Sequence, residues 1–401
     1  MNVEKILATR TSNIKVSAIR EILKLASNPG MISLGGGIPS PESFPLDLVN
    51  ELTEKVLSKY GTRALNYDLT EGFVPLREAL IDHLAGKGIK AKMENVYISS
   101  GSQGFLDAIG KVLISPGDYV AVEGPTYLAA LQSFNAYEAR YLQMETDEEG
   151  LIPESVEEIL KNNKVKFVYT VPTFQNPSGK TIGTERRKKI AEIIKKYDAL
   201  LIEDDPYGEL RYSGEPVPTI QSMAPDNVIY ASTFSKIFAP GLRTGYFVAP
   251  EEIGKWLVIV KQGIDLNTCT LAQALSAEYL IGGYLPSQLE KIIGLYRPKL
   301  NAMLKIMDDN LSDEFTYTEP EGGMFVWGNG PKGVDMEVVS KLTLERGMGF
   351  VPGKFFYPVV GDGIETFRLN FTSCSVEQIE KAVKIFAEVS NEYLEKHAAT
   401  V

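Results

Sequence analysis

The sequence of 401 residues contains only two cysteines and two histidines, and this scarcity excludes several kinds of site. Cys269 and Cys374 lie far apart, and neither has a second cysteine or a histidine at metal-ligand spacing. A disulfide framework and a structural zinc site are therefore not expected. His83 falls on a predicted helix surface and His397 near the C-terminus. The sequence therefore offers almost no histidines from which a hydrolase triad or a metal site could be built.

Long apolar runs are also missing. The sequence has no stretch of about 18 consecutive apolar residues, so no membrane span is predicted. Residues 1–7 lack the apolar core of a signal peptide, and we expect a cytoplasmic protein. The formal net charge of −11 disfavours nucleic acid as a partner. With 44% hydrophobic residues, the chain is long enough for a large core, divided between two domains.

The most informative segment is the loop around Lys236. It lies between two short apolar runs, 228–231 and 246–249, which predicts a loop between buried strands. A lysine removed from water at a strand end has a lowered pKa and can condense with a carbonyl group. The alternative is a surface lysine beside a Pro-Gly turn. Groups suited to binding phosphate surround the lysine, on Thr233, Ser235 and Arg243.

A second strand-like run, 199–203, ends at Asp204, and Tyr207 follows three residues later. This spacing lets both side chains enter one pocket at the strand end. A carboxylate there can keep a pyridinium nitrogen protonated, and a phenol can contact a ring oxygen, as pyridoxal phosphate requires. Alone, an Asp-Asp-Pro sequence is more typical of a solvated turn.

Two further strand ends carry polar residues. The predicted strand 165–171 runs into an Asn-Pro-x-Gly sequence, by itself a turn signal. The amide of Asn176, fixed by a proline whose preceding bond can be cis, is also suited to donate to a cofactor's ring oxygen. The predicted strand 95–99 leads into a helix start that can bind an anion, although any Ser or Gly can cap a helix. That helix starts with Gly101, Ser102 and Gln103.

The order of these motifs carries a resemblance to a known family. A Gly-Ser-Gln helix start, Asn-Pro-x-Gly, Asp-x-x-Tyr, Ser-Lys and an arginine seven residues after the lysine follow one another. In this order the chain resembles class I aminotransferases of the pyridoxal-phosphate fold type I superfamily, over almost its whole length. Segments 17–21, 32–39, 203–207 and 322–327 are similar to the subgroup of 2-aminoadipate, kynurenine and archaeal aromatic aminotransferases.

The resemblance implies a role for each cofactor-binding residue. Lys236 would bind pyridoxal phosphate covalently and carry protons, and Asp204 would bind the pyridinium nitrogen. Tyr207 and Asn176 would contact the ring oxygen, and Tyr127 would stack on the ring. The phosphate would be bound by Gly101, Ser102, Gln103, Thr233, Ser235 and Arg243, and by Tyr67 of the partner subunit in a homodimer.

The resemblance also implies a substrate site. Arg368 would bind the α-carboxylate, and an arginine in an apolar strand without a partner would be costly. Asn176 and Gly37 would line the same site. Arg20 lies ahead of the glycine-rich run 35–37, which could act as a hinge, so that Arg20 pairs with an acidic substrate side chain or swings to solvent for an apolar one. The alternative for Arg20 is a plain surface arginine on an amphipathic helix.

Strand and helix patterns alternate from about residue 95 to 249, which predicts a mostly parallel sheet with helices on both faces. A long helix is expected over 286–311, followed by an α+β unit with strands at 322–327 and 367–371. The resemblance implies an α/β protein of the fold type I transferase class, with a large domain and a smaller, discontinuous one. The expected boundaries are 1–45 for an N-terminal segment that joins the small domain, 46–290 for the large cofactor-binding domain, and 291–401 for the small domain.

The function implied by the resemblance is ping-pong transfer of an amino group to 2-oxoglutarate. The donor would be 2-aminoadipate, an aromatic or another large apolar amino acid, and no metal is expected. One alternative is a β-lyase or decarboxylase using the same cofactor site. Another is the effector-sensing domain of a regulator, which needs a DNA-binding domain with a basic face, and the acidic composition disfavours it.

Overall fold

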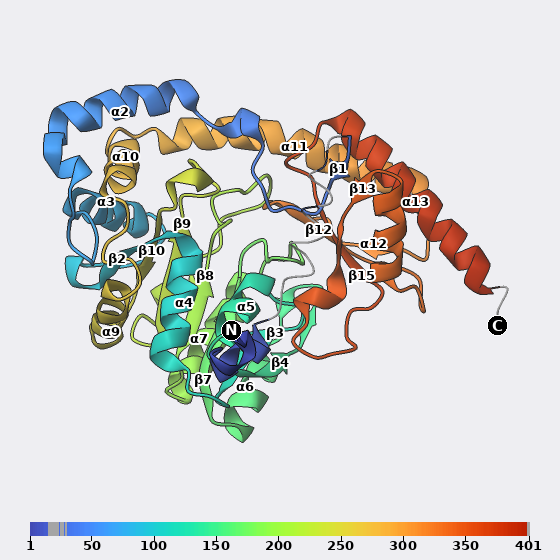
Figure 1. Cartoon of the computed structure of the whole chain (residues 1–401), viewed down its shortest axis with the longest axis horizontal. Coiled ribbons are helices and arrows are strands. Elements are labelled where there is room, and N and C mark those ends of the chain that lie inside the picture. Colours follow the sequence, from blue (N-terminus) through green and yellow to red (C-terminus); the bar gives the residue numbers. More distant parts are fainter. Residues whose placement is uncertain (15–23, 25–27, 29, 399–401) are drawn as a thin grey trace.

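The computed structural model describes residues 1–14, 24, 28 and 30–398 of the chain (Figure 1). Its larger part is built on a seven-stranded sheet with the order β2-β10-β9-β8-β7-β3-β4. All neighbouring strands are parallel except β10, which runs against both β2 and β9. This confirms the predicted mostly parallel sheet. Its strands are β2 (Val96–Ser99), β3 (Tyr119–Glu123), β4 (Arg140–Met144), β7 (Val165–Thr170), β8 (Leu201–Asp204), β9 (Val228–Thr233) and β10 (Gly245–Val248).

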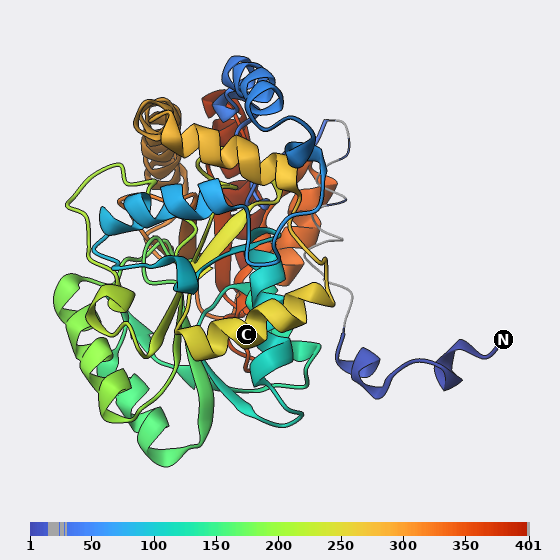
Figure 2. The same ribbon diagram turned by 90° about the vertical axis from the view of Figure 1, so that its left-hand side faces the viewer.

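Helices cover both faces of this sheet because side chains alternate along each strand. On β7, Val168 packs in the core cluster with α6 and α7, whereas Phe167 and Tyr169 point to the other face and contact Phe134 of α5. Figure 2 shows α6 and α7, in green, and α4, in cyan, on opposite sides of the strands. The helices of this part are α2 (Leu46–Tyr60), α3 (Val74–Ala85), α4 (Gly101–Leu113), α5 (Leu128–Asn135), α6 (Pro153–Asn162), α7 (Thr184–Lys196), α8 (Ile220–Met223), α9 (Glu251–Gln262) and α10 (Thr270–Ile281).

The smaller part has a four-stranded sheet with the order β11-β12-β15-β14. The N-terminal segment joins it, since β1 pairs with β13 and the Asn370 N–H donates to the Leu34 carbonyl at 2.7 Å. The predicted discontinuous α+β unit is therefore confirmed, while its boundaries stay a prediction. Its elements are β1 (Ile32–Ser33), β11 (Thr316–Tyr317), β12 (Phe325–Asn329), β13 (Met348–Gly349), β14 (Val351–Pro352), β15 (Thr366–Asn370), α12 (Met336–Glu345) and α13 (Val376–Ala398).

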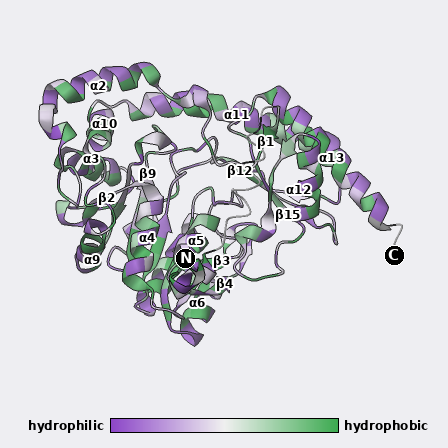
Figure 3. Cartoon of the chain, in the orientation of Figure 1, coloured by the Kyte–Doolittle hydropathy of each residue, from purple (hydrophilic) through white to green (hydrophobic). Residues whose placement is uncertain are grey.

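The two parts are connected by α11 (Leu285–Asn310), the predicted long helix, which crosses the expected boundary at residue 290. Along α2, α11 and α13, hydrophilic and hydrophobic residues alternate (Figure 3), as expected for helices with one face on the core. Among the helices that the structure describes, none combines the length and apolar character of a membrane span. A short hairpin of β5 (Thr146–Asp147) and β6 (Gly150–Leu151) completes the strands.

The sheet topology brings the sequence motifs together. Strands β2, β7, β8 and β9 share one direction, so their carboxyl ends lie at the same edge of the sheet. The last residues of these strands are Ser99, Thr170, Asp204 and Thr233, and each begins or shortly precedes one of the motifs. In open α/β sheets this edge is where ligands bind.

A buried arginine fastens the loop that follows β7. Arg187 of α7 is 1% exposed and donates to the carbonyls of Pro172, at 2.8 Å, and Ile182, at 2.7 Å. It also donates to the Thr173 hydroxyl at 2.8 Å and lies 3.8 Å from the buried Glu203 carboxylate. The fold thus fixes both ends of the loop that carries Asn176.

We predict that Arg187→Met lowers the free energy of unfolding by about 3–5 kcal/mol, because it leaves the buried Glu203 carboxylate without a counter-charge and removes the hydrogen bonds to the Pro172 and Ile182 carbonyls. The neighbouring Arg186 binds the partly exposed Asp147, so Arg186→Met is the matched control, with a loss of about 1 kcal/mol or less. Urea unfolding of both variants measures the difference. Equal losses would contradict the structural role of Arg187.

Candidate active site

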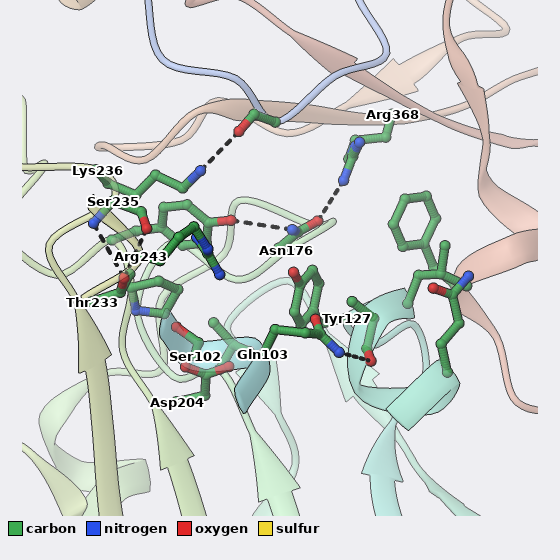
Figure 4. A pocket seen from close by; sticks show the side chains of 18 residues that line it. Ser102, Gln103, Tyr127, Asn176, Asp204, Thr233, Ser235, Lys236, Arg243 and Arg368 are labelled. Carbon is green, nitrogen blue, oxygen red and sulfur yellow. Dashed lines mark hydrogen bonds between the residues drawn. The ribbon is translucent and has the colours of Figure 1, made fainter. Parts of the chain in front are cut away.

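A cavity of about 460 Å³ lies at the carboxyl edge of the sheet, below the glycine-rich segment 35–37 (Figure 4). Most of the predicted site residues line it, together with side chains that the sequence did not point to. The predicted residues are Gly37, Ser102, Gln103, Tyr127, Asn176, Asp204, Tyr207, Thr233, Ser235, Lys236, Arg243 and Arg368, and the additional ones include Leu128, Gln132 and Phe356.

Lys236 follows β9 by three residues, and its amine opens into the cavity. Its Nζ donates to the Gly37 carbonyl at 2.8 Å. Burial, with the positive charges of Arg243 and Arg368 nearby, lowers the pKa of Lys236 to about 8. A substantial fraction of the amine is therefore neutral and nucleophilic at mildly alkaline pH.

Asp204 is the last residue of β8 and is 1% exposed. Its Oδ2 accepts a hydrogen bond of 2.7 Å from the Tyr169 hydroxyl, while Oδ1 is buried without a partner in the described part of the chain. Burial raises the pKa of Asp204 to about 7, although the bond from Tyr169 works in the opposite direction. A buried carboxylate oxygen without a hydrogen-bond partner is suited to accept a hydrogen bond from a ligand in the cavity.

The adjacent Asp205 faces away from the cavity. Its Oδ2 accepts a hydrogen bond from the Tyr230 hydroxyl at 2.8 Å and lies 3.6 Å from Lys87 Nζ. Lys87 in turn pairs with Glu209 at 2.9 Å. The structure therefore separates the two neighbouring acids, placing Asp204 in the cavity and Asp205 in an ionic cluster behind it.

The glycine that begins α4 lets the Arg243 guanidinium approach the N-terminus of this helix closely. Gly101 has φ of +71°, and a Cβ there would lie 2.4 Å from Arg243 Nη2. The Thr233 and Ser235 hydroxyls lie 2.9 Å apart, and with Ser102 and the exposed Arg243 they face the same space. Backbone N–H groups, hydroxyls and a guanidinium form the donor set that phosphate prefers.

Two loops with cis peptide bonds form another wall of the cavity. The bonds are Gly124-Pro125 and Asn176-Pro177, and Gln175 connects the loops by donating to the Pro125 carbonyl at 2.7 Å. Asn176 Nδ2 donates to the Tyr207 hydroxyl at 3.2 Å, so the two predicted ring-oxygen partners are already side by side. Burial raises the pKa of the nearby Tyr127 to about 12, which keeps its phenol neutral.

Arg368 enters from β15 of the smaller part. It donates to Asn176 Oδ1 at 2.8 Å and to the Gly35 carbonyl at 2.6 Å, while its Nε has no partner among the described residues. Its guanidinium lies between the rings of Phe325, at 4.2 Å, and Phe356, at 4.8 Å. Burial lowers the pKa of Arg368 to about 10, so it remains charged near neutral pH and available for an anion.

Two of the predicted residues that the structure describes, Gly101 and Tyr67, are not among those that line the cavity. Tyr67 is 78% exposed and lies in a separate surface hollow with Arg63 and Asp68. Arg20 lies outside the described residues, so its predicted role stays a prediction. Among the residues that the structure describes, no group of three His, Cys, Asp or Glu side chains could hold a metal ion.

Sequence reasoning missed Tyr169. It occupies the strand next to Asp204 and points to the same face of the sheet as the cavity-side core. The available signal was weak, because a tyrosine in the mainly apolar segment 167–171 is not unusual and the register of β7 against β8 is not visible in the sequence.

Comparisons with known proteins agree over the length of the chain. The family model described as aminotransferase class I and II matches residues 30–386. The chain is 43% identical to aromatic-amino-acid aminotransferase 1 of Thermococcus litoralis, over 99% of this chain and 96% of the relative.

Two solved structures are also similar over nearly the whole chain. Kynurenine aminotransferase of Pyrococcus horikoshii, in complex with PMP, KYN as substrate and KYA as product, has a TM-score of 0.94 and 42% identity over 98% of each chain. The α-aminoadipate aminotransferase of Thermus thermophilus, complexed with N-(5'-phosphopyridoxyl)-L-leucine, has a TM-score of 0.91 and 35% identity, covering 98% of this chain and 100% of that one.

The raised pKa of Asp204 predicts a pH-dependent stability of the cofactor-free protein. Its folded-state value of about 7 exceeds the usual value of about 4, so the folded protein binds this proton more tightly, and stability falls as pH rises between the two values. Asp204→Asn removes this dependence. It should stabilise the protein by about 1–2 kcal/mol at pH 5 and by about 4 kcal/mol at pH 8, because one pKa unit corresponds to about 1.4 kcal/mol.

Urea unfolding at the two pH values tests this, because other buried acids are common to both proteins and cancel in the difference. Asp205→Asn is the matched control: it removes a carboxylate compensated by Lys87 and should destabilise at both pH values. A gain from Asp204→Asn that is the same at pH 5 and pH 8 would be incompatible with a buried, uncompensated Asp204.

Proposed function

This chain belongs to the class I and II aminotransferases, which use pyridoxal phosphate, and we propose that it transfers the amino group of 2-aminoadipate, an aromatic or another large apolar amino acid to 2-oxoglutarate. The observation that carries the proposal is that one cavity holds three unusual groups. They are Lys236 with a lowered pKa, the Asp204 oxygen Oδ1 without a hydrogen-bond partner, and Arg368 without an acidic partner among the described residues. In this proposal the lysine binds the aldehyde carbon of pyridoxal phosphate, the carboxylate binds its ring nitrogen, and the arginine binds the α-carboxylate of the substrate.

The residues present fit the cofactor group by group. Oδ1 of Asp204 lacks a donor, which a protonated ring nitrogen supplies. The space beside Gly101 has phosphate-binding groups around it, including Ser102, Ser235 and Arg243. We assign Asn176 and Tyr207 to the ring oxygen, Tyr127 to the ring face, and Gln103 and Thr233 to the edge of the phosphate site.

Bound in this cavity, pyridoxal phosphate supplies an electron sink for the charge that develops at the substrate α-carbon. The chain supplies positioning and proton transfer. Arg368 binds the α-carboxylate through its free Nε and the nitrogens now bonded to Asn176 and Gly35, which orients the bond to be broken. Lys236 Nζ, close to half neutral at about pH 8, takes the proton from the α-carbon.

The choice of substrates rests on the relatives and on the cavity wall. Relatives named for aromatic amino acids, kynurenine and α-aminoadipate differ in the charge of the donor side chain. Leu128 and Phe356 offer an apolar surface to a large side chain. For an acidic side chain we retain Arg20 as the proposed partner, with Gly37 at the hinge; the cytoplasmic location also stays a prediction.

A panel of single amino acids tests this proposal. Mixing the holoenzyme with 2-aminoadipate or phenylalanine should remove the absorbance of the lysine-bound cofactor, and adding 2-oxoglutarate should restore it. Lys236→Ala should show neither change, whereas Lys180→Ala, a lysine outside the cavity lining, should behave as wild type. If 2-oxoglutarate fails to restore the absorbance while another oxo acid succeeds, the proposed acceptor is wrong.

We further propose a homodimer in which Tyr67 completes the phosphate site of the other subunit. The support is its position: Tyr67 is 78% exposed in its own chain and lies on a surface hollow away from its own cavity. A side chain with this exposure is free to contact a second copy.

Mixed dimers test the role of Tyr67. Tyr67→Ala should weaken cofactor binding, and Lys236→Ala should be inactive. When the two are refolded together, sites that combine an intact Lys236 with an intact Tyr67 should form in about a quarter of positions by random pairing of subunits. Fluorescence titration with pyridoxal phosphate and activity measure the recovery; no recovery, or a monomer in sedimentation, would refute the proposal.

A further inference from the structure

Two buried tyrosines donate in the same way to two adjacent acids. The Tyr169 hydroxyl donates to Oδ2 of Asp204 at 2.7 Å, and the Tyr230 hydroxyl donates to Oδ2 of Asp205 at 2.8 Å. Tyr169 lies on β7 and Tyr230 on β9, the two strands that flank β8. Both tyrosines are 0% exposed, so each phenol has a direction fixed by the sheet.

The surroundings of the two acids differ. Asp205 has a cation beside it, Lys87, whereas no lysine or arginine contributes to the pKa shift of Asp204 in the described part of the chain. The titratable groups that face Asp204 are Tyr169 from β7, Tyr127 at the start of α5, and Asp205 and Tyr207 beyond the end of β8. None of them is positive, and Tyr169 is the one that donates a hydrogen bond to the carboxylate.

Tyr169 is held firmly enough to orient a partner. Its ring packs edge-on against Phe134, with 5.9 Å between ring centroids, and its backbone is paired with β3 and β8. A donor fixed at Oδ2 restricts rotation of the carboxylate and leaves Oδ1 as the oxygen without a partner. Asp204 lines the cavity with this arrangement already formed.

We propose that Tyr169 is a positioning residue that fixes Asp204 with Oδ1 available to the cofactor's ring nitrogen and keeps the proton of that contact on the nitrogen. The inference rests on the role proposed above for Asp204. Tyr169 touches neither substrate nor cofactor in this assignment and acts through the carboxylate.

The physical reason is competition for one proton. Oδ1 and the ring nitrogen share it, and it resides on the stronger base. A hydrogen bond to Oδ2 stabilises the ionised carboxylate and makes Asp204 the weaker base, which counteracts the effect of burial. Without that bond the proton moves from nitrogen to Oδ1, both groups become neutral, and the ring loses the positive charge that makes it an electron sink.

The experiment uses holoenzyme reconstituted with pyridoxal phosphate labelled with ¹⁵N in the ring. In wild type the ¹⁵N signal should be that of a protonated nitrogen across neutral pH. Tyr169→Phe removes one oxygen and should shift the signal toward the unprotonated value, with kcat lower by about 10- to 100-fold and KM little changed. Tyr230→Phe, the matched control, should leave the signal and its pH profile unchanged.

A second probe does not depend on the phenylalanine variant folding. Replacing Tyr169 by 3-fluorotyrosine makes the phenol a stronger donor, so the ring nitrogen should stay protonated to higher pH than in wild type. An unchanged ¹⁵N pH profile in either the phenylalanine or the fluorotyrosine protein would overturn the inference.

Asp204→Asn separates the inference from its premise. If Asp204→Asn deprotonates the ring nitrogen but Tyr169→Phe does not, Asp204 keeps its proposed role and only the role of Tyr169 fails. If Asp204→Asn leaves the ¹⁵N signal unchanged, the assignment of Asp204 itself fails, and the inference about Tyr169 falls with it.

Discussion

Burial of charge without a counter-charge is the constraint on which this site depends. Lys236, Asp204 and Arg368 open onto one cavity, and none of them forms an ion pair in the part of the chain that the structure describes. Such groups destabilise a folded protein unless something pairs with them. Their pKa values, about 8, 7 and 10, all move toward the neutral form, the direction that desolvation imposes. A bound cofactor and a substrate carboxylate would provide partners for these three groups and so remove the cost of burying them. The groups that lower the stability of the ligand-free protein therefore also determine which ligands it binds.

The rest of the fold provides the rigidity that this arrangement requires. Parallel strands deliver Asp204 and Thr233 to one edge of the sheet, and Arg187 and Gln175 fasten the loop with Asn176 by hydrogen bonds to buried carbonyls. Arg368 comes from the smaller part, so the site is complete only when both parts are in contact. Asp205, which lies outside the cavity lining, has a compensating cation beside it, Lys87.

The sequence predicted the sheet and most of the residues that line the cavity, because polar residues suited to binding stand at the ends of recognisable apolar strands. Lys236, Asp204 and Asn176 each stand just after a recognisable strand, and the predicted sheet brought them together. Tyr169 was not predictable, since its contact with Asp204 depends on the register of β7 against β8, which many apolar sequences would satisfy. Tyr67 does not line its own cavity, and the role proposed for it depends on a second copy of the chain, which the sequence pattern alone does not place. The role of Arg20 also remains a prediction, because Arg20 lies in a segment outside the described residues.

The most direct test of this account is a crystal structure of the protein with pyridoxal phosphate and a dicarboxylate substrate analogue. The account predicts the ring nitrogen within hydrogen-bond distance of Asp204 Oδ1, with the bond from Tyr169 to Oδ2 retained. It also predicts the phosphate between Gly101 and Arg243 and the α-carboxylate on Arg368. A ring nitrogen bound to another group, or an α-carboxylate away from Arg368, would contradict the claim that these unpaired buried groups define the ligands.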